Sequence, residues 1–216
     1  MPDINYNLLP REDILRLIPN KVKNILDVGC ANGVLGKKLK EKGLYVEGIE
    51  INKKLAQEAS KYIDKVHVCD LDKTNIKFKN EFDLVICADI IEHLKNPEEF
   101  LINYSKILSD EGYFIISVPN VRYYYVLWSL LKGEWKYADR GIFDKTHLRF
   151  FTLKSIKQLL KNCGLETVKI NRNYRSIEKY CAYQTLAKYL SLYFLKDFLT
   201  FQYVILAKKI IKNNKL

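Results

Sequence analysis

Short hydrophobic runs alternate with amphipathic segments along most of the chain. The runs are nearly continuous in apolar residues, which is typical of strands buried on both faces of a sheet. They predict seven strands, at residues 24–28, 44–50, 65–68, 82–87, 112–118, 165–170 and 201–208. The segments between them predict helices at residues 34–42, 53–61, 96–108 and 152–163, with a further helical segment between the last two strands.

This alternation of strand and helix predicts a Rossmann-like α/β fold. Repeated β-α units favour a mostly parallel sheet, here of seven strands, with helices on both faces. The 216 residues suit a single domain, residues 1–216. Residues 119–151 interrupt the alternation after the fifth strand and are rich in aromatic and basic side chains. Long connections in compact domains are often functional, so we expect this insertion to be a substrate lid.

The chain is strongly basic, with a formal net charge of +11. This charge favours acidic partners, namely phosphorylated metabolites, nucleic acid or an anionic membrane surface, although the lysines form no long run. The five cysteines form no C-x-x-C pair, and an odd number cannot all pair internally, so we expect a reducing, cytoplasmic location. The apolar stretch 186–207 is interrupted by Lys188, Lys196 and Asp197, which argues against a membrane span.

Glycine and acidic residues follow the first three predicted strands. Gly29 and Gly33 lie between the first strand and a helix, where the backbone can approach a ligand closely. Their spacing lacks the G-x-G-x-x-G pattern of dinucleotide sites, which argues against NAD. Glu50 ends the second strand and is placed to accept hydrogen bonds from ribose hydroxyls. Asp70 and Leu71 follow the third strand, where they suit an adenine ring.

Together these motifs resemble those of class I S-adenosylmethionine-dependent methyltransferases. The resemblance is carried, in chain order, by ILDVGCANG, VEGIE, VCDL, FDLVICADIIEHLKNP and GYFIISVPN, and it spans nearly the whole chain. It implies S-adenosylmethionine as cofactor, bound by Asp27, Gly29, Cys30, Ala31, Asn32, Gly33, Glu50, Ile51, Asp70, Leu71, Ala88, Asp89 and Ile90. Members of the family usually have glycine where this chain has Ala31, which leaves the detail of that contact open.

Two of the three histidines are candidates for catalysis, whereas His67 lies within a predicted strand and is expected to be structural. His93 follows Glu92 just beyond the fourth strand, beside the expected methyl position. Quinone-pathway O-methyltransferases are similar here and are thought to hold a divalent metal, which points to Asp89, Glu92 and His93. We expect metal-free catalysis, because Glu-His-Leu recurs in the family without metal. His147, in the insertion, is the preferred general base. The alternative is that His147 is structural and that Glu92 or His93 is the base.

The insertion also bears on the acceptor. Residues 119–151 are similar to a subgroup of methyltransferases from surface-polysaccharide pathways. Aromatic rings stack on sugars and arginines hold phosphates. We therefore expect methyl transfer to a hydroxyl or amine of a sugar or glycan precursor that bears phosphate, with Arg140 or Arg149 at the phosphate. The same aromatic side chains are expected to form part of the insertion's own core.

Three other functions remain as alternatives. A quinone-pathway O-methyltransferase would act on a different small molecule. A nucleic-acid methyltransferase suits the charge, but the Asp/Asn-Pro-Pro-aromatic motif of the enzymes that methylate base amino groups is replaced here by ADIIEH. The third alternative is a non-catalytic S-adenosylmethionine-binding partner of another enzyme, against which the nearly intact set of acidic residues argues.

Overall fold

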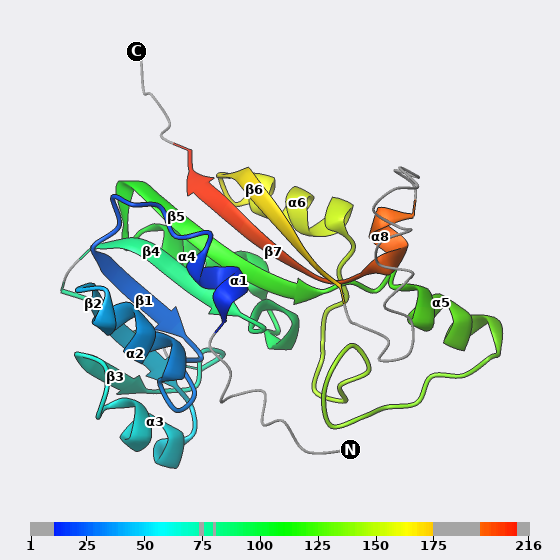
Figure 1. Cartoon of the computed structure of the whole chain (residues 1–216), viewed down its shortest axis with the longest axis horizontal. Helices are drawn as coiled ribbons and strands as arrows, with labels where there is room; N and C mark the ends of the chain where they lie inside the picture. Colours follow the sequence, from blue (N-terminus) through cyan, green and yellow to red (C-terminus); the bar gives the residue numbers. More distant parts are fainter. Residues whose placement is uncertain (1–10, 74–75, 80, 175–194, 211–216) are drawn as a thin grey trace.

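A seven-stranded sheet forms the centre of the molecule (Figure 1). The computed structural model describes residues 11–73, 76–79, 81–174 and 195–210. The strands are β1 (Asn24–Val28), β2 (Tyr45–Glu50), β3 (Lys65–Val68), β4 (Phe82–Ala88), β5 (Leu108–Pro119), β6 (Leu165–Tyr174) and β7 (Thr200–Lys209). They lie in the order β3-β2-β1-β4-β5-β7-β6, so the order reverses at β1 and β4.

Strands β1 to β5 are parallel, and β7 is antiparallel to both of its neighbours, β5 and β6. The prediction of a mostly parallel seven-stranded sheet is confirmed, with antiparallel pairing at the C-terminal side. Tyr203 and Ile205 of β7 are completely buried, like the residues of the central parallel strands. A continuous apolar run therefore predicts a buried strand but does not tell its direction.

Helices cover both faces of the sheet, as predicted. They are α1 (Glu12–Leu15), α2 (Val34–Glu41), α3 (Lys53–Ala59), α4 (Pro97–Ser105) and α6 (Leu153–Asn162). Ile14, Leu39 and Ala59, from α1, α2 and α3, lie in one buried cluster with the sheet. Leu101 and Ile156, from α4 and α6, lie in the other. Because helices cover both faces of the sheet, a site can form where the strands end.

The ends of several elements follow local signals, and some of them differ from the prediction. The Asn96 side chain accepts a hydrogen bond from the Glu99 amide and so begins α4. That helix ends at Ser105 and β5 begins at Leu108, because Leu108 already pairs with Phe82 of β4. The helical segment expected between the last two strands falls largely on residues 175–194, outside the described residues. The short helix α8 (Lys196–Leu199) is described there.

Residues 119–151, the 119–151 segment, leave the sheet at the end of β5 and return at the start of α6 (Figure 1). The two ends are tied together, because the Val121 amide donates to the Phe151 carbonyl at 3.0 Å. The segment contains one helix, α5 (Tyr124–Leu131). Its Asn120 side chain also donates to backbone carbonyls around α8, which fixes the segment on the last strand.

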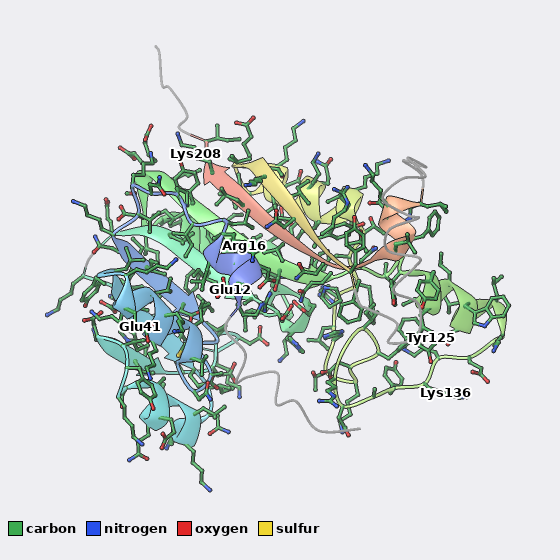
Figure 2. All side chains as sticks on the ribbon, viewed as in Figure 1. Glu12, Arg16, Glu41, Tyr125, Lys136 and Lys208 are labelled. Atoms are coloured by element: carbon green, nitrogen blue, oxygen red, sulfur yellow. The ribbon has the colours of Figure 1, made fainter. Side chains whose placement is uncertain are left out.

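The aromatic side chains of the 119–151 segment divide into two groups. Tyr123 is buried with Val126 in a small cluster, and Trp135 packs against this cluster, so part of the segment forms its own core as expected. Tyr125 and Lys136 are exposed at the end of the molecule away from β3 (Figure 2). None of the helices in the described part of the chain combines the length and apolar character needed to span a lipid bilayer.

Candidate active site

A cavity of about 470 Å³ opens at the carboxyl ends of the parallel strands. Ligands of open α/β sheets usually bind at this edge, close to the point where the strand order reverses. All the predicted cofactor residues line the cavity except Gly33, namely Asp27, Gly29, Cys30, Ala31, Asn32, Glu50, Ile51, Asp70, Leu71, Ala88, Asp89 and Ile90. The fold therefore brings to one cavity residues that are spread over four segments of the sequence.

The loop from β1 to α2 adopts left-handed backbone at three positions, with φ of 74° at Gly29, 49° at Ala31 and 81° at Gly33. A Cβ added at Gly29 would lie 2.2 Å from Cδ1 of Ile90. A Cβ added at Gly33 would lie 2.8 Å from Cα of Ala59, on α3. Gly33 begins α2 and lets that helix approach α3. It is not among the residues that line the cavity, and its contact with the cofactor stays a prediction.

Glu50 links the end of β2 to this loop. Its buried carboxylate accepts hydrogen bonds from the Ala31 amide at 3.0 Å and from the Asn52 amide at 2.8 Å. A carboxylate has about four acceptor sites, so two remain for hydroxyl groups in the cavity. The carboxylate of Asp70 is tied down in a similar way by the Asp72 amide, at 3.0 Å. Both acids therefore have fixed positions before any ligand binds.

Asp27 is the most deeply buried acid of the cavity, with 2% of its surface exposed. Burial raises the pKa of Asp27 to about 7, against the opposing charge of Arg11. The carboxyl is thus partly protonated near neutral pH. A cationic ligand in the cavity would favour the charged form.

The turn after β4 is held by a network that the sequence does not reveal. Asp89 has a left-handed φ of 57°. One carboxylate oxygen accepts from the Arg11 guanidinium at 3.0 Å, and the other accepts from the Ser117 hydroxyl at 2.8 Å and from the Gln202 amide. Arg11 also lines the cavity, although no motif marks it. The only signal in the sequence is a basic residue that begins the first helix.

Glu92, His93 and His147, the predicted catalytic residues, meet beside the cavity. His93 lines the cavity, and its ring lies edge-to-face with the ring of His147, with 4.7 Å between their centroids. The backbone carbonyl of Glu92 accepts from the Leu148 amide at 2.8 Å, which fixes the 119–151 segment on the turn after β4. We call these three residues the Glu92–His93–His147 cluster.

The side chains of the cluster have unusual surroundings. Glu92 is 1% exposed, and neither carboxylate oxygen has a hydrogen-bond partner among the described residues. Burial, together with the charge of Asp89, raises the pKa of Glu92 well above its usual range. Burial and the neighbouring His93 lower the pKa of His147, so its neutral form is able to accept a proton at neutral pH. These donor atoms also suit a metal ion, since two imidazoles and a carboxylate are common ligands of Zn²⁺.

The third histidine has a different position. His67 lies on β3 with its Nε2 atom 2.6 Å from the carboxylate of Glu47. It does not line the cavity. Its surroundings fit the structural role expected for it.

Residues 5–170 match the model of a family described as a methyltransferase domain. The chain belongs to this family. The expected class, a S-adenosylmethionine-dependent methyltransferase, is confirmed at the level of family and fold.

Individual relatives share only a modest part of their sequence with this chain. A ubiquinone biosynthesis O-methyltransferase from Rickettsia bellii is 29% identical over 181 residues, which cover 76% of this chain and 75% of the relative. A protein of the same name from Aromatoleum aromaticum is 25% identical over 156 residues, which cover 68% of this chain and 66% of the relative. The methyltransferase chain therefore spans about two thirds to three quarters of the length of these relatives.

A solved structure supports the fold. A S-adenosylmethionine-dependent methyltransferase from Archaeoglobus fulgidus aligns with a TM-score of 0.64 at 23% identity, over 92% of each chain. At this identity the likeness concerns the arrangement of the strands and helices.

Proposed function

We propose that this methyltransferase transfers a methyl group from S-adenosylmethionine, bound in the 470 Å³ cavity, to a hydroxyl group of a small molecule. One observation carries the proposal: His93 both lines the cavity and contacts His147 of the 119–151 segment. The donor cavity thus adjoins, through His93, a cluster able to take up a hydroxyl proton. A non-catalytic binding protein or a simple amine methyltransferase would not need such a cluster.

In this proposal the cavity fixes the cofactor in a single orientation. Glu50 accepts hydrogen bonds from the ribose hydroxyls, and Asp70 with Leu71 holds the adenine. Asp27 then faces the cationic end of the cofactor, where a positive charge stabilises its carboxylate. Alignment of the two reactants is the main contribution that a protein makes to methyl transfer from an activated donor.

The reaction itself forms a bond from the acceptor oxygen to the methyl carbon and breaks the bond from that carbon to the sulfonium sulfur. The hydroxyl proton must leave as the methyl group arrives. In this proposal His147 accepts it, because burial and the neighbouring His93 lower the pKa of His147 and favour its neutral form. A divalent ion held by the Glu92–His93–His147 cluster would instead act as a Lewis acid, which lowers the pKa of a bound hydroxyl.

Two acceptor classes compete, and the comparisons favour a phenolic hydroxyl. The relatives from Rickettsia bellii and Aromatoleum aromaticum are named as O-methyltransferases of ubiquinone biosynthesis. A phenol is acidic enough for a histidine, or an ion, to promote its ionisation. We therefore propose a phenolic quinone precursor as the first candidate.

A phosphate-bearing sugar or glycan precursor is the second candidate. It is favoured by the composition of the 119–151 segment, which joins exposed aromatic residues such as Tyr125 with exposed cations such as Arg149. Aromatic faces suit sugar rings and arginine suits phosphate. This segment would then act as the lid over the acceptor.

The test is a methyl-transfer assay with labelled S-adenosylmethionine and two acceptor panels, one of catechols and one of nucleotide-linked sugars. We expect labelled product with a catechol. Transfer only to sugars would favour the second candidate, and binding of S-adenosylmethionine without transfer to any acceptor would argue against both. Glu50→Gln serves as the cofactor-site control, because losing charged hydrogen bonds should weaken cofactor binding by about 1–3 kcal/mol.

A further inference from the structure

The buried carboxylate of Glu92 requires something to balance it. The side chain is 1% exposed, and both of its oxygens lack a hydrogen-bond partner in the described part of the chain. A buried carboxylate without partners is unfavourable and is normally compensated by a proton, a cation or an ordered water. The groups around Glu92 show which of these fits.

Two histidine nitrogens lie close to the Glu92 carboxylate. Glu92, His93 and His147 each offer one ligand atom, and these atoms all lie within 4.8 Å of one another. Ligand atoms about 2.1 Å from a tetrahedral Zn²⁺ are about 3.4 Å apart. The widest pair would therefore have to approach by up to about 1.4 Å when the ion binds.

The hydrogen bonds of the two imidazoles fix which nitrogen is available. Nδ1 of His93 lies 3.3 Å from the Thr146 carbonyl oxygen, and Nδ1 of His147 lies 3.4 Å from the Ile142 carbonyl oxygen. A carbonyl oxygen can only accept, so these contacts favour the tautomer in which each Nδ1 carries the proton. Each neutral ring then keeps a lone pair on Nε2. Histidines that bind metals are usually held in this way.

Asp144 strengthens the same arrangement at His93. The Thr146 hydroxyl is 2.6 Å from an oxygen of Asp144 and 3.1 Å from Nδ1 of His93. Burial opposes ionisation of Asp144, but hydrogen bonds from Thr146 lower its pKa below the usual value. The hydroxyl proton therefore points to Asp144, and its oxygen accepts from His93. The carboxylate thus acts on His93 through Thr146.

Asp89 does not belong to this group, although the resemblance to quinone-pathway enzymes points to it. Its carboxylate already accepts hydrogen bonds from Arg11, Ser117 and Gln202. Few lone pairs therefore remain for an ion. To bind one, Asp89 would have to give up one of these three hydrogen bonds.

We propose that Glu92, His93 and His147 bind one divalent ion of the kind that prefers nitrogen ligands, such as Zn²⁺, with His147 as third ligand and Asp89 outside the site. This replaces the expectation of metal-free catalysis. Only the role of the ion rests on the proposed function. In that function the ion would lie beside the acceptor hydroxyl, with His147 as one of its ligands. Since His147 belongs to the 119–151 segment, the ion would also tie that segment to the end of β4.

The test is a titration of the full-length, chelator-treated protein with Zn²⁺, followed by calorimetry, with Mg²⁺ as comparison. We expect one Zn²⁺ per chain and much weaker binding of Mg²⁺, which prefers oxygen ligands. Glu92→Gln and His147→Asn should each weaken Zn²⁺ binding by about tenfold or more. Asparagine keeps an amide donor near the Ile142 carbonyl while removing Nε2.

Two variants serve as matched controls. Asp89→Asn and His67→Asn should leave Zn²⁺ affinity within about threefold of the parent, because neither side chain reaches the ion. Equal losses in Asp89→Asn and His147→Asn would overturn the assignment of the third ligand. Unchanged Zn²⁺ binding in Glu92→Gln would overturn the site itself and leave Glu92 balanced by a proton.

Two further measurements separate this proposal from the proposed function. Calorimetry with S-adenosylmethionine on the same variants uses no metal, so it reports the donor cavity alone. If Glu92→Gln fails to fold, the visible absorption of Co²⁺ added to the parent and to His147→Asn gives the answer. The spectrum should change when the His147 nitrogen is lost, and an identical spectrum would contradict its assignment as ligand.

Discussion

The guanidinium of Arg11 lies 3.0 Å from the carboxylate of Asp89, across 78 residues of sequence. This ion pair joins the first helix to the turn after β4, at the wall of the cavity. Arg11 also pairs with Asp13, at 3.0 Å. One arginine therefore offsets two carboxylates and opposes the raised pKa of a third, Asp27.

Replacing this arginine should destabilise the protein. Arg11→Gln would leave Asp13 and Asp89 without their cation in a partly buried place, so we expect the free energy of unfolding to fall by about 1–2 kcal/mol. Denaturant unfolding followed by circular dichroism measures this. Arg16→Gln is the control, because Arg16 is exposed near the same helix (Figure 2) and should change little. Equal losses in both variants would mean that the ion pair with Asp89 adds nothing.

The sequence predicts the parts of the site that depend on strand ends. Asp27, Glu50 and Asp70 follow three parallel strands, and such ends must meet at one edge of a sheet. The resemblance to the methyltransferase family adds the turn after β4. The mostly parallel direction of the strands follows from the regular alternation of strand and helix.

Other parts of the site depend on contacts that no local pattern shows. Gln202 reaches Asp89 because β7 runs antiparallel beside β5, and an apolar run gives no direction. His93 and His147 are each visible as candidates. Their contact, however, depends on how the 119–151 segment folds back onto the carbonyl of Glu92. Arg11 precedes the first strand and carries no motif.

Binding of S-adenosylmethionine should release protons near neutral pH. The pKa of Asp27 in the free protein is raised to about 7, mainly by burial, so at pH 6 its carboxyl is mostly protonated. The cationic groups of the cofactor favour the carboxylate and should expel this proton. At pH 8.5 the proton is already absent, so release should vanish there.

Calorimetry in buffers of different ionisation enthalpy counts the protons released. We expect a value approaching one proton per cofactor at pH 6 and near zero at pH 8.5. The isosteric variant Asp27→Asn should abolish the difference between the two pH values. Proton release that persists in this variant would assign it to another group.

His147 should matter for turnover and not for binding of the donor. It is absent from the cavity lining, so His147→Asn should leave the affinity for S-adenosylmethionine nearly unchanged. Loss of a general base typically lowers kcat by about 10²–10⁴-fold, and loss of a metal ligand would act in the same direction. Steady-state kinetics with the accepted acceptor measures this. A variant with intact kcat and reduced stability would show that His147 only anchors the 119–151 segment.

Ala31 offers a test of the backbone of the cofactor loop. Its φ of 49° lies in the left-handed region, which costs an L-residue with a Cβ about 1–2 kcal/mol. Ala31→Gly removes the strain but gives the unfolded chain more freedom, worth about 0.4–1 kcal/mol in the opposite direction. We therefore expect the free energy of unfolding to rise by up to about 1 kcal/mol, measured by denaturant unfolding.

Ala56→Gly, within α3, is the matched control. It should lower the free energy of unfolding by about 1 kcal/mol or more, because glycine is unfavourable inside a helix. If Ala31→Gly were as destabilising as Ala56→Gly, the left-handed conformation of Ala31 would cost the protein nothing.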